Sequence, residues 1–363
     1  TQRTVASSDS NFYKDGVSYI TIEPHLGSDG QSASSLLSTL SSWGSNHKLS
    51  GIAYLALKFK WNQDIFGSIP KVQARIKGKK IVTLASNLSE QTASYSTNPA
   101  FCILDYLRNE RYGKGIATSD IDLQSIYDAS QVCITQVTPF SGGADINLFD
   151  TNAVLDTSKK VIENIRHLIR GCRGLLPYSS GKYKLVIETT GSASITLTED
   201  DIIGGYNLSS PSKNERYNRV IVSFVDSTRN YQINECQFPP VDDSSLASSD
   251  QHATMKTADG GFLLEGRFDF HTLTSKFQAQ EMAEIILRRS RDALQLSINV
   301  GFNGYDLVIG DIVNITHSSI GFSSKPFRVM SLTFNEDYTI GLTLVEYQGS
   351  HYTFAQQSAQ TTV

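Results

Sequence analysis

The sequence predicts a β-rich α+β protein with several domains. At 363 residues the chain exceeds the size at which a single hydrophobic core usually stops growing. Charged residues make up only 19% of the chain and aromatic residues reach 10%, a composition typical of pleated β surfaces. The apolar period also changes along the chain, from two residues to between three and four, and back to two. We therefore expect two β-barrel-like domains with a helical or α+β domain between them.

These changes of period also divide the chain. Because the chain begins at Thr1 rather than Met, we expect either processing or further sequence upstream that completes the first domain. The expected divisions are a mostly β, barrel-like domain at 1–95, a helical or α+β domain at 96–190, a second β-barrel domain at 191–352 and a polar tail at 353–363. Within the second barrel domain we expect a polar excursion at 239–261 and a helix at 274–293.

Strict alternation predicts the strands of the first domain. Residues 17–23 (VSYITIE) and 51–61 (GIAYLALKFKW) have the period of two that a half-buried strand requires. Residues 71–80 (KVQARIKGKK) repeat this pattern, which predicts a third strand. Its expected inward residues are Val72, Ala74 and Ile76, and its outward cations are Lys71, Arg75, Lys77, Lys79 and Lys80.

We interpret this cationic row as a solvated strand face or as an edge protected by lysine. Contact with nucleic acid is the alternative. The net charge of the whole chain is −4, whereas binding of nucleic acid by bulk electrostatics requires a strongly basic domain.

Residues 98–115 carry the sharpest local signal in the chain. Asn98 is a favourable N-cap, and Pro99 stands at the first helical position, where its missing N–H costs nothing. We expect Gly113 to adopt the left-handed backbone conformation that ends this helix. A phosphate cradle at Gly113 is disfavoured, because the glycines of such loops precede a helix rather than follow one.

The same rules place the later elements. We expect a second helix behind Asp120 and a third behind Thr157 and Ser158, with an apolar stripe along one side. The stripe of the third helix consists of Val161, Ile162, Ile165, Leu168 and Ile169. A hairpin with Ser-Ser-Gly at its turn is expected within 175–188. The last strands are expected at 218–226 and in the segments ALQLSINV, GDIVNIT, PFRVMSLTF and YTIGLTLVEY.

No pattern in the sequence indicates a catalytic, cofactor-binding or metal site. The seven histidines form no HxxxH or HExxH pair, and no GxSxG or phosphate-loop motif occurs. Carboxylates cluster at 199–201 and 336–337, and a glycosidase needs two carboxyl groups roughly 5–10 Å apart across a cleft. We interpret Glu199 and Asp201 as a helix start or turn, and Glu336 with Asp337 as a hairpin turn.

The four cysteines and the hydropathy add two further expectations. Cys102, Cys133, Cys172 and Cys236 are widely spaced and form no CxxC motif, so we expect buried free thiols rather than a zinc or redox site. No apolar run approaches the roughly 20 residues that a membrane-spanning helix needs.

Several segments together resemble the central tail-tip hub, or tip attachment, proteins of long-tailed bacteriophages and related gene-transfer particles. The most characteristic segment is TNPAFCILDYLRNERYGKGI at 97–116, which is followed by a helix behind 121–123 that ends near Cys133. The other segments, in the same order as in that family, are 49–81, 156–185, 197–226 and 287–352. The resemblance covers about 45–352, which is most of the chain.

This resemblance implies a structural role without catalysis, in a protein related to the hub of contractile-tail baseplates. It implies a homotrimer that closes the distal end of the tail tube, with two barrels per subunit in a pseudo-sixfold ring that opens for DNA release. The implied partners are the distal tail protein, the tape-measure protein and tail-fibre or receptor-binding proteins. Phage DNA would pass through transiently, and the host envelope would be contacted only indirectly.

The implied location is the tip of the virion tail, after assembly in the host cytoplasm. Two alternatives stay open: a tail-associated glycan or peptidoglycan hydrolase, and a receptor-binding or carbohydrate-binding module.

Overall fold

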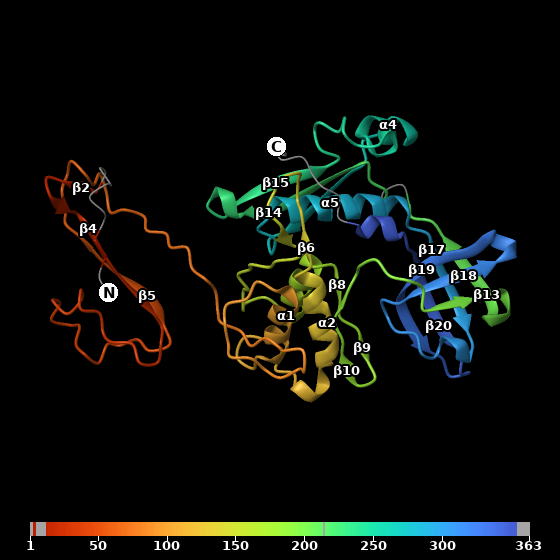
Figure 1. Cartoon of the computed structure of the whole chain (residues 1–363), viewed down its shortest axis with the longest axis horizontal. Helices are drawn as coiled ribbons and strands as arrows, with labels where there is room; N and C mark the ends of the chain where they lie inside the picture. Colours follow the sequence, from red (N-terminus) through yellow and green to blue (C-terminus); the bar gives the residue numbers. More distant parts are fainter. Residues whose placement is uncertain (1–2, 5–11, 213–214, 354–363) are drawn as a thin grey trace. The chain divides into compact units, whose positions relative to one another are not determined.

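The computed structural model describes residues 3–4, 12–212 and 215–353 (Figure 1). Helices account for 23% of the structure and strands for 29%, which confirms the β-rich α+β class. The contacts divide the chain into two compact units, Thr1–Ile76 and Lys77–Val363, which are described separately.

The first unit is built on two antiparallel strands. β4 (Ile20–Leu26) pairs with β5 (Ala53–Phe59) along its whole length, and the short β1 (Arg3–Thr4) adds to the other side of β4. β2 (Tyr13–Lys14) and β3 (Val17–Ser18) form a separate hairpin. The strands expected from alternation at 17–23 and 51–61 are therefore confirmed.

A buried carboxylate on β4 organises the loop between these strands. Glu23 accepts hydrogen bonds from Ser34 Oγ at 2.6 Å, from the backbone N–H of Leu36 at 2.8 Å, and from both the N–H and the hydroxyl of Ser35. Burial acts to raise the pKa of Glu23, but the four donors outweigh it and lower the pKa to about 2. Glu23 thus holds residues 34–36 against the sheet as an ionised group.

The predicted strand at 71–80 is wrong. These ten residues form neither helix nor strand, and every one of them is exposed. An alternating sequence of apolar and polar residues fits a half-buried surface. A strand also needs a neighbouring strand that forms hydrogen bonds with its backbone N–H and C=O groups. Within the described part of this chain, no neighbouring strand pairs with residues 71–80.

Three helices begin the second unit, close to where the sequence predicts them. They are α1 (Pro99–Arg108), α2 (Leu123–Cys133) and α3 (Val161–Gly171). The predicted N-cap is confirmed, since the Asn98 side chain accepts from Ala100 N at 3.0 Å and donates to Ser130 O on α2. The N-cap of α2 is Asp122 rather than Asp120, because Asp120 belongs to a preceding 3₁₀ turn.

The predicted role of Gly113 is also wrong. Asn109 caps α1 in an extended conformation, and the left-handed glycine is Gly115, with φ +70°. Gly113 instead marks a close approach, because a Cβ atom there would lie 1.9 Å from the carbonyl oxygen of Tyr106. The chain folds back over the end of α1 at this point, and only glycine leaves room for it.

Short antiparallel pairs connect the helices. They are β6 (Gln136–Val137) with β7 (Ile146–Asn147), β8 (Gly174–Leu175) with β11 (Val186–Ile187), and β9 (Tyr178–Ser179) with β10 (Lys182–Tyr183). The β9–β10 pair is the hairpin expected within 175–188. Its turn residues Ser180 and Gly181 both have positive φ, as a two-residue hairpin turn of the favoured type requires.

The helices share one core with a three-stranded sheet and a long helix. β14 (Arg219–Asp226) lies between β15 (Gln232–Phe238), which is antiparallel to it, and β16 (Glu265–Phe270), which is parallel. α5 (Lys276–Arg291) runs along this sheet (Figure 1) and confirms the helix expected at 274–293. The expected polar excursion at 239–261 contains one helix that the sequence did not predict, α4 (His252–Ala258), which buries Met255.

The remaining strands form a curled six-stranded sheet with the shape of a half-barrel, which we call the barrel. Its order is β12 (Ile195–Leu197), β18 (Ile312–His317), β19 (Phe322–Phe334), β20 (Ile340–Glu346), β17 (Gln295–Val300) and β13 (Ile202–Ser209). The edge strands β12 and β13 are joined by the single 3₁₀ turn η2 (Glu199–Asp201). The ring centroids of Tyr206 on β13 and His317 on β18 lie 5.0 Å apart.

The barrel encloses its own apolar core, separate from that of the helices and the three-stranded sheet. Leu197, Val313, Phe327 and Leu344 are completely buried in it. Apolar side chains alternate inward along each strand, so the outer face of the barrel is left to the other half of the residues.

Candidate functional site

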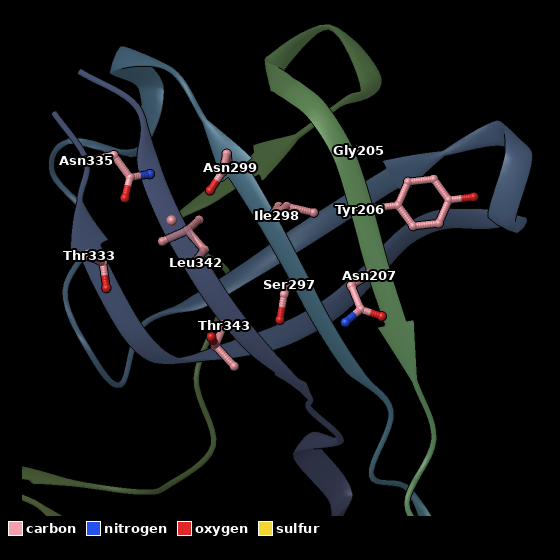
Figure 2. A pocket seen from close by; sticks show the side chains of 11 residues that line it. Gly205, Tyr206, Asn207, Ser297, Ile298, Asn299, Thr333, Asn335, Leu342 and Thr343 are labelled. Carbon is pink, nitrogen blue, oxygen red and sulfur yellow. The ribbon is translucent and has the colours of Figure 1, made fainter. Parts of the chain in front are cut away.

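The outer face of the barrel carries a shallow polar hollow of about 550 Å³. Asn207, Ser297 and Thr343 come from three neighbouring strands and lie side by side in register (Figure 2). The full lining is Gly205, Tyr206, Asn207, Ser297, Ile298, Asn299, Thr333, Asn335, Gly341, Leu342 and Thr343. Ile298 and Leu342 belong to the core beneath. The hollow therefore offers hydrogen-bonding groups without any charged side chain.

Three exposed aromatic rings gather beside this hollow. Phe302 on η6 (Phe302–Gly304) stacks on Tyr305 with 5.6 Å between ring centroids, and Tyr305 lies 5.9 Å from Phe334 at the end of β19. Phe302 is 83% exposed, Tyr305 58% and Phe334 62%. Tyr338, on the turn that follows β19, is 94% exposed. We call these four residues the aromatic end of the barrel. Soluble proteins rarely leave such a cluster uncovered unless it binds something.

The charges of the barrel are almost all negative. Residues 191–209 and 294–347 contain eight carboxylates but only two cations, Lys325 and Arg328. Lys325 Nζ lies 2.6 Å from Glu346 Oε1, and Arg328 is 5% exposed and donates to backbone carbonyls. The outer face of the barrel thus presents carboxylates and neutral polar groups, including exposed Asp306 and Glu336 beside the aromatic end.

Glu199 and Asp201, the two carboxylates that the hydrolase alternative would need, instead hold the turn between β12 and β13. Asp201 accepts from the N–H and the hydroxyl of Thr198, both at 2.8 Å, and from the Asn303 amide. Glu199 accepts from Ser318 N and lies 3.3 Å from His317 Nδ1. These hydrogen bonds lower the pKa of both groups, so both are ionised at neutral pH. The interpretation of Glu199 and Asp201 as a helix start is confirmed by the capping box of η2.

The other carboxylate cluster also has the predicted structural role. Asp337 accepts from the N–H of Thr339 at 3.1 Å and from its hydroxyl at 2.7 Å, which closes the turn between β19 and β20. These hydrogen bonds lower the pKa of Asp337.

The cysteines are free, and three of the four are buried, as predicted. Burial raises the pKa of Cys102, Cys172 and Cys236 to about 12, so their thiols stay protonated and unreactive at neutral pH. Over residues 3–4, 12–212 and 215–353, no group of three or more His, Cys, Asp or Glu side chains is placed to hold a metal ion. No helix among the same residues is long and apolar enough to cross a membrane.

A buried ionic junction connects the barrel to the helical part of the second unit. Arg173, just after α3, pairs with Glu281 of α5 at 3.2 Å, and Arg289 of α5 pairs with Glu188 at 2.6 Å. On the barrel side, Arg328 donates to Gly310 O and Thr189 O.

One aromatic side chain lies between the two halves of this junction. The ring centroid of Tyr352, on the 3₁₀ turn η8 (Gly349–Tyr352), is 5.6 Å from the guanidinium of Arg173 and 5.3 Å from that of Arg328. Tyr352 also stacks on Tyr347 at 5.6 Å. Sequence reasoning did not find the junction, since its members are scattered over the chain with no recurring spacing.

Comparison with known proteins gives consistent matches for this architecture. Residues 160–332 match a family model described as a putative phage tail protein. The baseplate hub protein pb3 of Escherichia phage T5 is 24% identical over 320 residues, which is 84% of this chain and 32% of that protein. The tip attachment protein J of Escherichia phage SECphi27 is 22% identical over 309 residues, which is 80% of this chain and 23% of that protein.

The chain is similar in sequence to a phage baseplate hub protein and to a phage tip attachment protein. This similarity confirms the resemblance drawn from the sequence segments. A protein of the native gene transfer agent virion has a similar fold, with a TM-score of 0.57 over 93% of this chain and 73% of that chain, at 12% identity. The chain spans about a third or less of the length of the two phage relatives.

Proposed function

We propose that this chain is a structural hub of a bacteriophage tail tip, without catalytic activity. In this role it closes the distal end of the tail tube as a homotrimer and anchors the distal tail protein, the tape-measure protein and the host-binding components. It must then open for release of the DNA. The observation that carries this proposal is the match to a baseplate hub protein along 84% of the chain.

The surface of the protein supports an assembly role. Hubs need broad interfaces, and obligate interfaces bury on the order of 2,000–5,000 Å². Large apolar side chains are widely exposed on both units, among them Leu26, Trp61, Ile69, Val154, Phe262 and Phe302. Closed symmetry lets one such chain cover these side chains by repeating around an axis.

The experiment that tests the proposal is co-expression with the distal tail protein and the tape-measure protein of the same particle. Mass photometry of the purified chain should find a species of three 39.9-kDa subunits, and negative-stain images of the complex should show rings. A monomer that binds neither tail protein at micromolar concentration would contradict the proposal.

A zymogram on cell-wall substrate tests the absence of catalysis. We expect no clearing from the wild-type chain. Clearing that the substitutions Glu199→Gln and Asp201→Asn abolish would instead support the hydrolase alternative and overturn the structural role of these side chains.

A further inference from the structure

A row of polar side chains without partners crosses the hollow on the outer face of the barrel. Asn207 on β13, Ser297 on β17 and Thr343 on β20 lie opposite one another in register (Figure 2). Within the part of the chain that the structure describes, none of these three side chains forms a hydrogen bond. Their donors and acceptors are therefore free to bind a ligand.

Gly341 forms the floor of a notch at one end of this hollow. It lies on β20 opposite Asn299 of β17 and Thr333 of β19. A Cβ atom at position 341 would lie 3.3 Å from Asn299 Oδ1 and 3.7 Å from Asn335 Nδ2, so two amides flank the open space (Figure 2). Asn335 Nδ2 donates one hydrogen to Thr339 Oγ1 and has a second for a ligand. Glycine inside a strand often marks a place where a ligand approaches the backbone closely.

The aromatic end of the barrel borders this notch. Phe334 stands between Thr333 and Asn335, at the end of β19. Phe302 and Tyr305 stack with an angle of 11° between their ring planes, and both are largely exposed. Flat, exposed ring faces suit the apolar C–H face of a sugar ring, because the face of an aromatic ring carries partial negative charge.

The chemistry of this surface selects one class of ligand. An anion is disfavoured because the barrel carries eight carboxylates and both of its cations are engaged, and a cation finds no carboxylate in the lining. A peptide cannot add as a strand, because β17 and β20 each have a paired strand on both sides. An apolar ligand finds no exposed apolar floor, since Ile298 and Leu342 are buried beneath the hollow. A neutral ligand rich in hydroxyl groups fits, because hydroxyls and amides each donate and accept.

We propose that the hollow and the aromatic end together bind a neutral oligosaccharide. Its hydroxyl groups pair with the amides of Asn207 and Asn299, and one sugar ring packs on the exposed face of Phe302. The volume of about 550 Å³ lies within the range of roughly 300–1,000 Å³ that ligand sites occupy. OB-fold proteins likewise bind oligosaccharides on the face of a small, partly open barrel. This inference goes beyond the proposed hub role and does not depend on it.

The test uses the full-length chain and saturation-transfer NMR with hexasaccharides of known charge. The neutral probes are the hexamers of glucose, mannose, galactose and N-acetylglucosamine, and the charged comparators are the hexamers of galacturonic acid and glucosamine. We expect at least one neutral hexamer to bind with a dissociation constant of about 1 mM or tighter. Failure of all four neutral probes, or binding of the charged hexamers alone, would overturn the inference.

Three variants place the binding on this surface. Gly341→Val fills the notch, Asn299→Ala removes one amide, and Phe302→Ala removes the exposed ring. We expect each to weaken binding by about tenfold or more. The matched controls, Gly67→Val and Phe262→Ala, change exposed positions outside the barrel and should leave binding unchanged. The two alanine variants alter exposed side chains and still decide the question if Gly341→Val does not fold. Binding that survives in both of them contradicts the proposed site.

Vesicles separate recognition of the sugar from insertion of the exposed rings into a lipid surface. Phosphatidylcholine vesicles are sedimented with the protein, with and without a glycolipid that carries the bound hexamer. We expect only the glycolipid vesicles to carry the protein down, and equal binding to plain vesicles would refute the glycan site. A trimer that binds no glycan would overturn this inference but leave the hub role intact, whereas a monomer that binds glycan would do the reverse.

Discussion

Arg173 and Glu281 form an ion pair in the interior of the protein, with 3.2 Å between Nη1 and Oε1. Their side chains are only 2% and 5% exposed, and Arg173 also lies 4.7 Å above the ring of Phe149. Glu281 Oε2 and two of the guanidinium nitrogens have no hydrogen-bond partner. A buried pair with unsatisfied atoms contributes little net stability but is costly to break from one side.

Removing only the cation should therefore destabilise the protein. Arg173→Met leaves a buried carboxyl group without its partner and should cost on the order of 3 kcal/mol at pH 8. The double variant Arg173→Met with Glu281→Leu should be close to the wild type. Urea unfolding measures both, and the control is Arg267→Met in an exposed pair with Glu235, which should cost less than about 1 kcal/mol. A double variant as unstable as the single would refute this account.

Glu281 should also make stability depend on pH. Burial raises its pKa from 4.5 to about 7, against the attraction of Arg173. Between these values the folded protein keeps a proton that the unfolded chain has lost, so stability falls as the pH rises through this window. The loss is on the order of 3 kcal/mol by pH 8. The variant Glu281→Gln cannot titrate, so its stability relative to wild type should improve from pH 4.5 to pH 8 in paired urea titrations. A constant difference would count against the raised pKa.

Gly113 should tolerate no side chain. A Cβ atom there meets the carbonyl oxygens of Tyr106 at 1.9 Å and Asn109 at 2.8 Å, and both belong to the backbone. Gly113→Ala should therefore cost about 1–3 kcal/mol, as for other overpacked sites. Gly78→Ala is the matched control, because nothing lies within 4 Å of its added Cβ. Thermal unfolding of the two variants checks this, and equal melting temperatures would disprove the steric argument.

Glu23 should control the order of the loop that it holds. Glu23→Gln removes the charge that binds four donors, so the amides of Ser35 and Leu36 should exchange hydrogen faster at pH 7. Asp29→Asn, at an exposed loop position, is the control. Because the folded pKa of Glu23 is lowered to about 2, its contribution is complete above pH 4.5 and is lost as the pH falls toward 2. The two proteins should therefore converge as the pH falls toward 2, and a difference at pH 2 as large as that at pH 7 would contradict this.

Sequence reasoning succeeded where the signal is local. Asn98 and Pro99 fix the start of α1 by their own backbone chemistry, and Ser180 with Gly181 fixes a hairpin turn. It failed at 71–80, because pairing with a neighbour decides whether an alternating segment becomes a strand. The parallel partner of β14 was also missed, since a parallel pair joins distant segments without a turn to mark it.

The surfaces that carry the proposals depend on tertiary structure. Tyr305 and Phe334 come within 5.9 Å, measured between ring centroids, only because β17 and β19 both flank β20 in the barrel. Outward and inward aromatic residues look alike in a sequence, and the strand register alone separates them. Likewise, Arg173 and Glu281 stand 108 residues apart, and no periodicity connects them.

The barrel is discontinuous in the chain, and this affects the entropic cost of forming it. β13 ends at Ser209 and its partner β17 begins at Gln295, so residues 210–294, with the three-stranded sheet and α5, are inserted between them. Closing a loop of that length carries an entropic cost. A folded insert removes this cost, because its ends already lie near each other. During synthesis β12 and β13 leave the ribosome before β18 and β17, the strands with which they pair. We expect the folded insert to hold Ser209 and Gln295 close together and so to favour the pairing of β13 with β17.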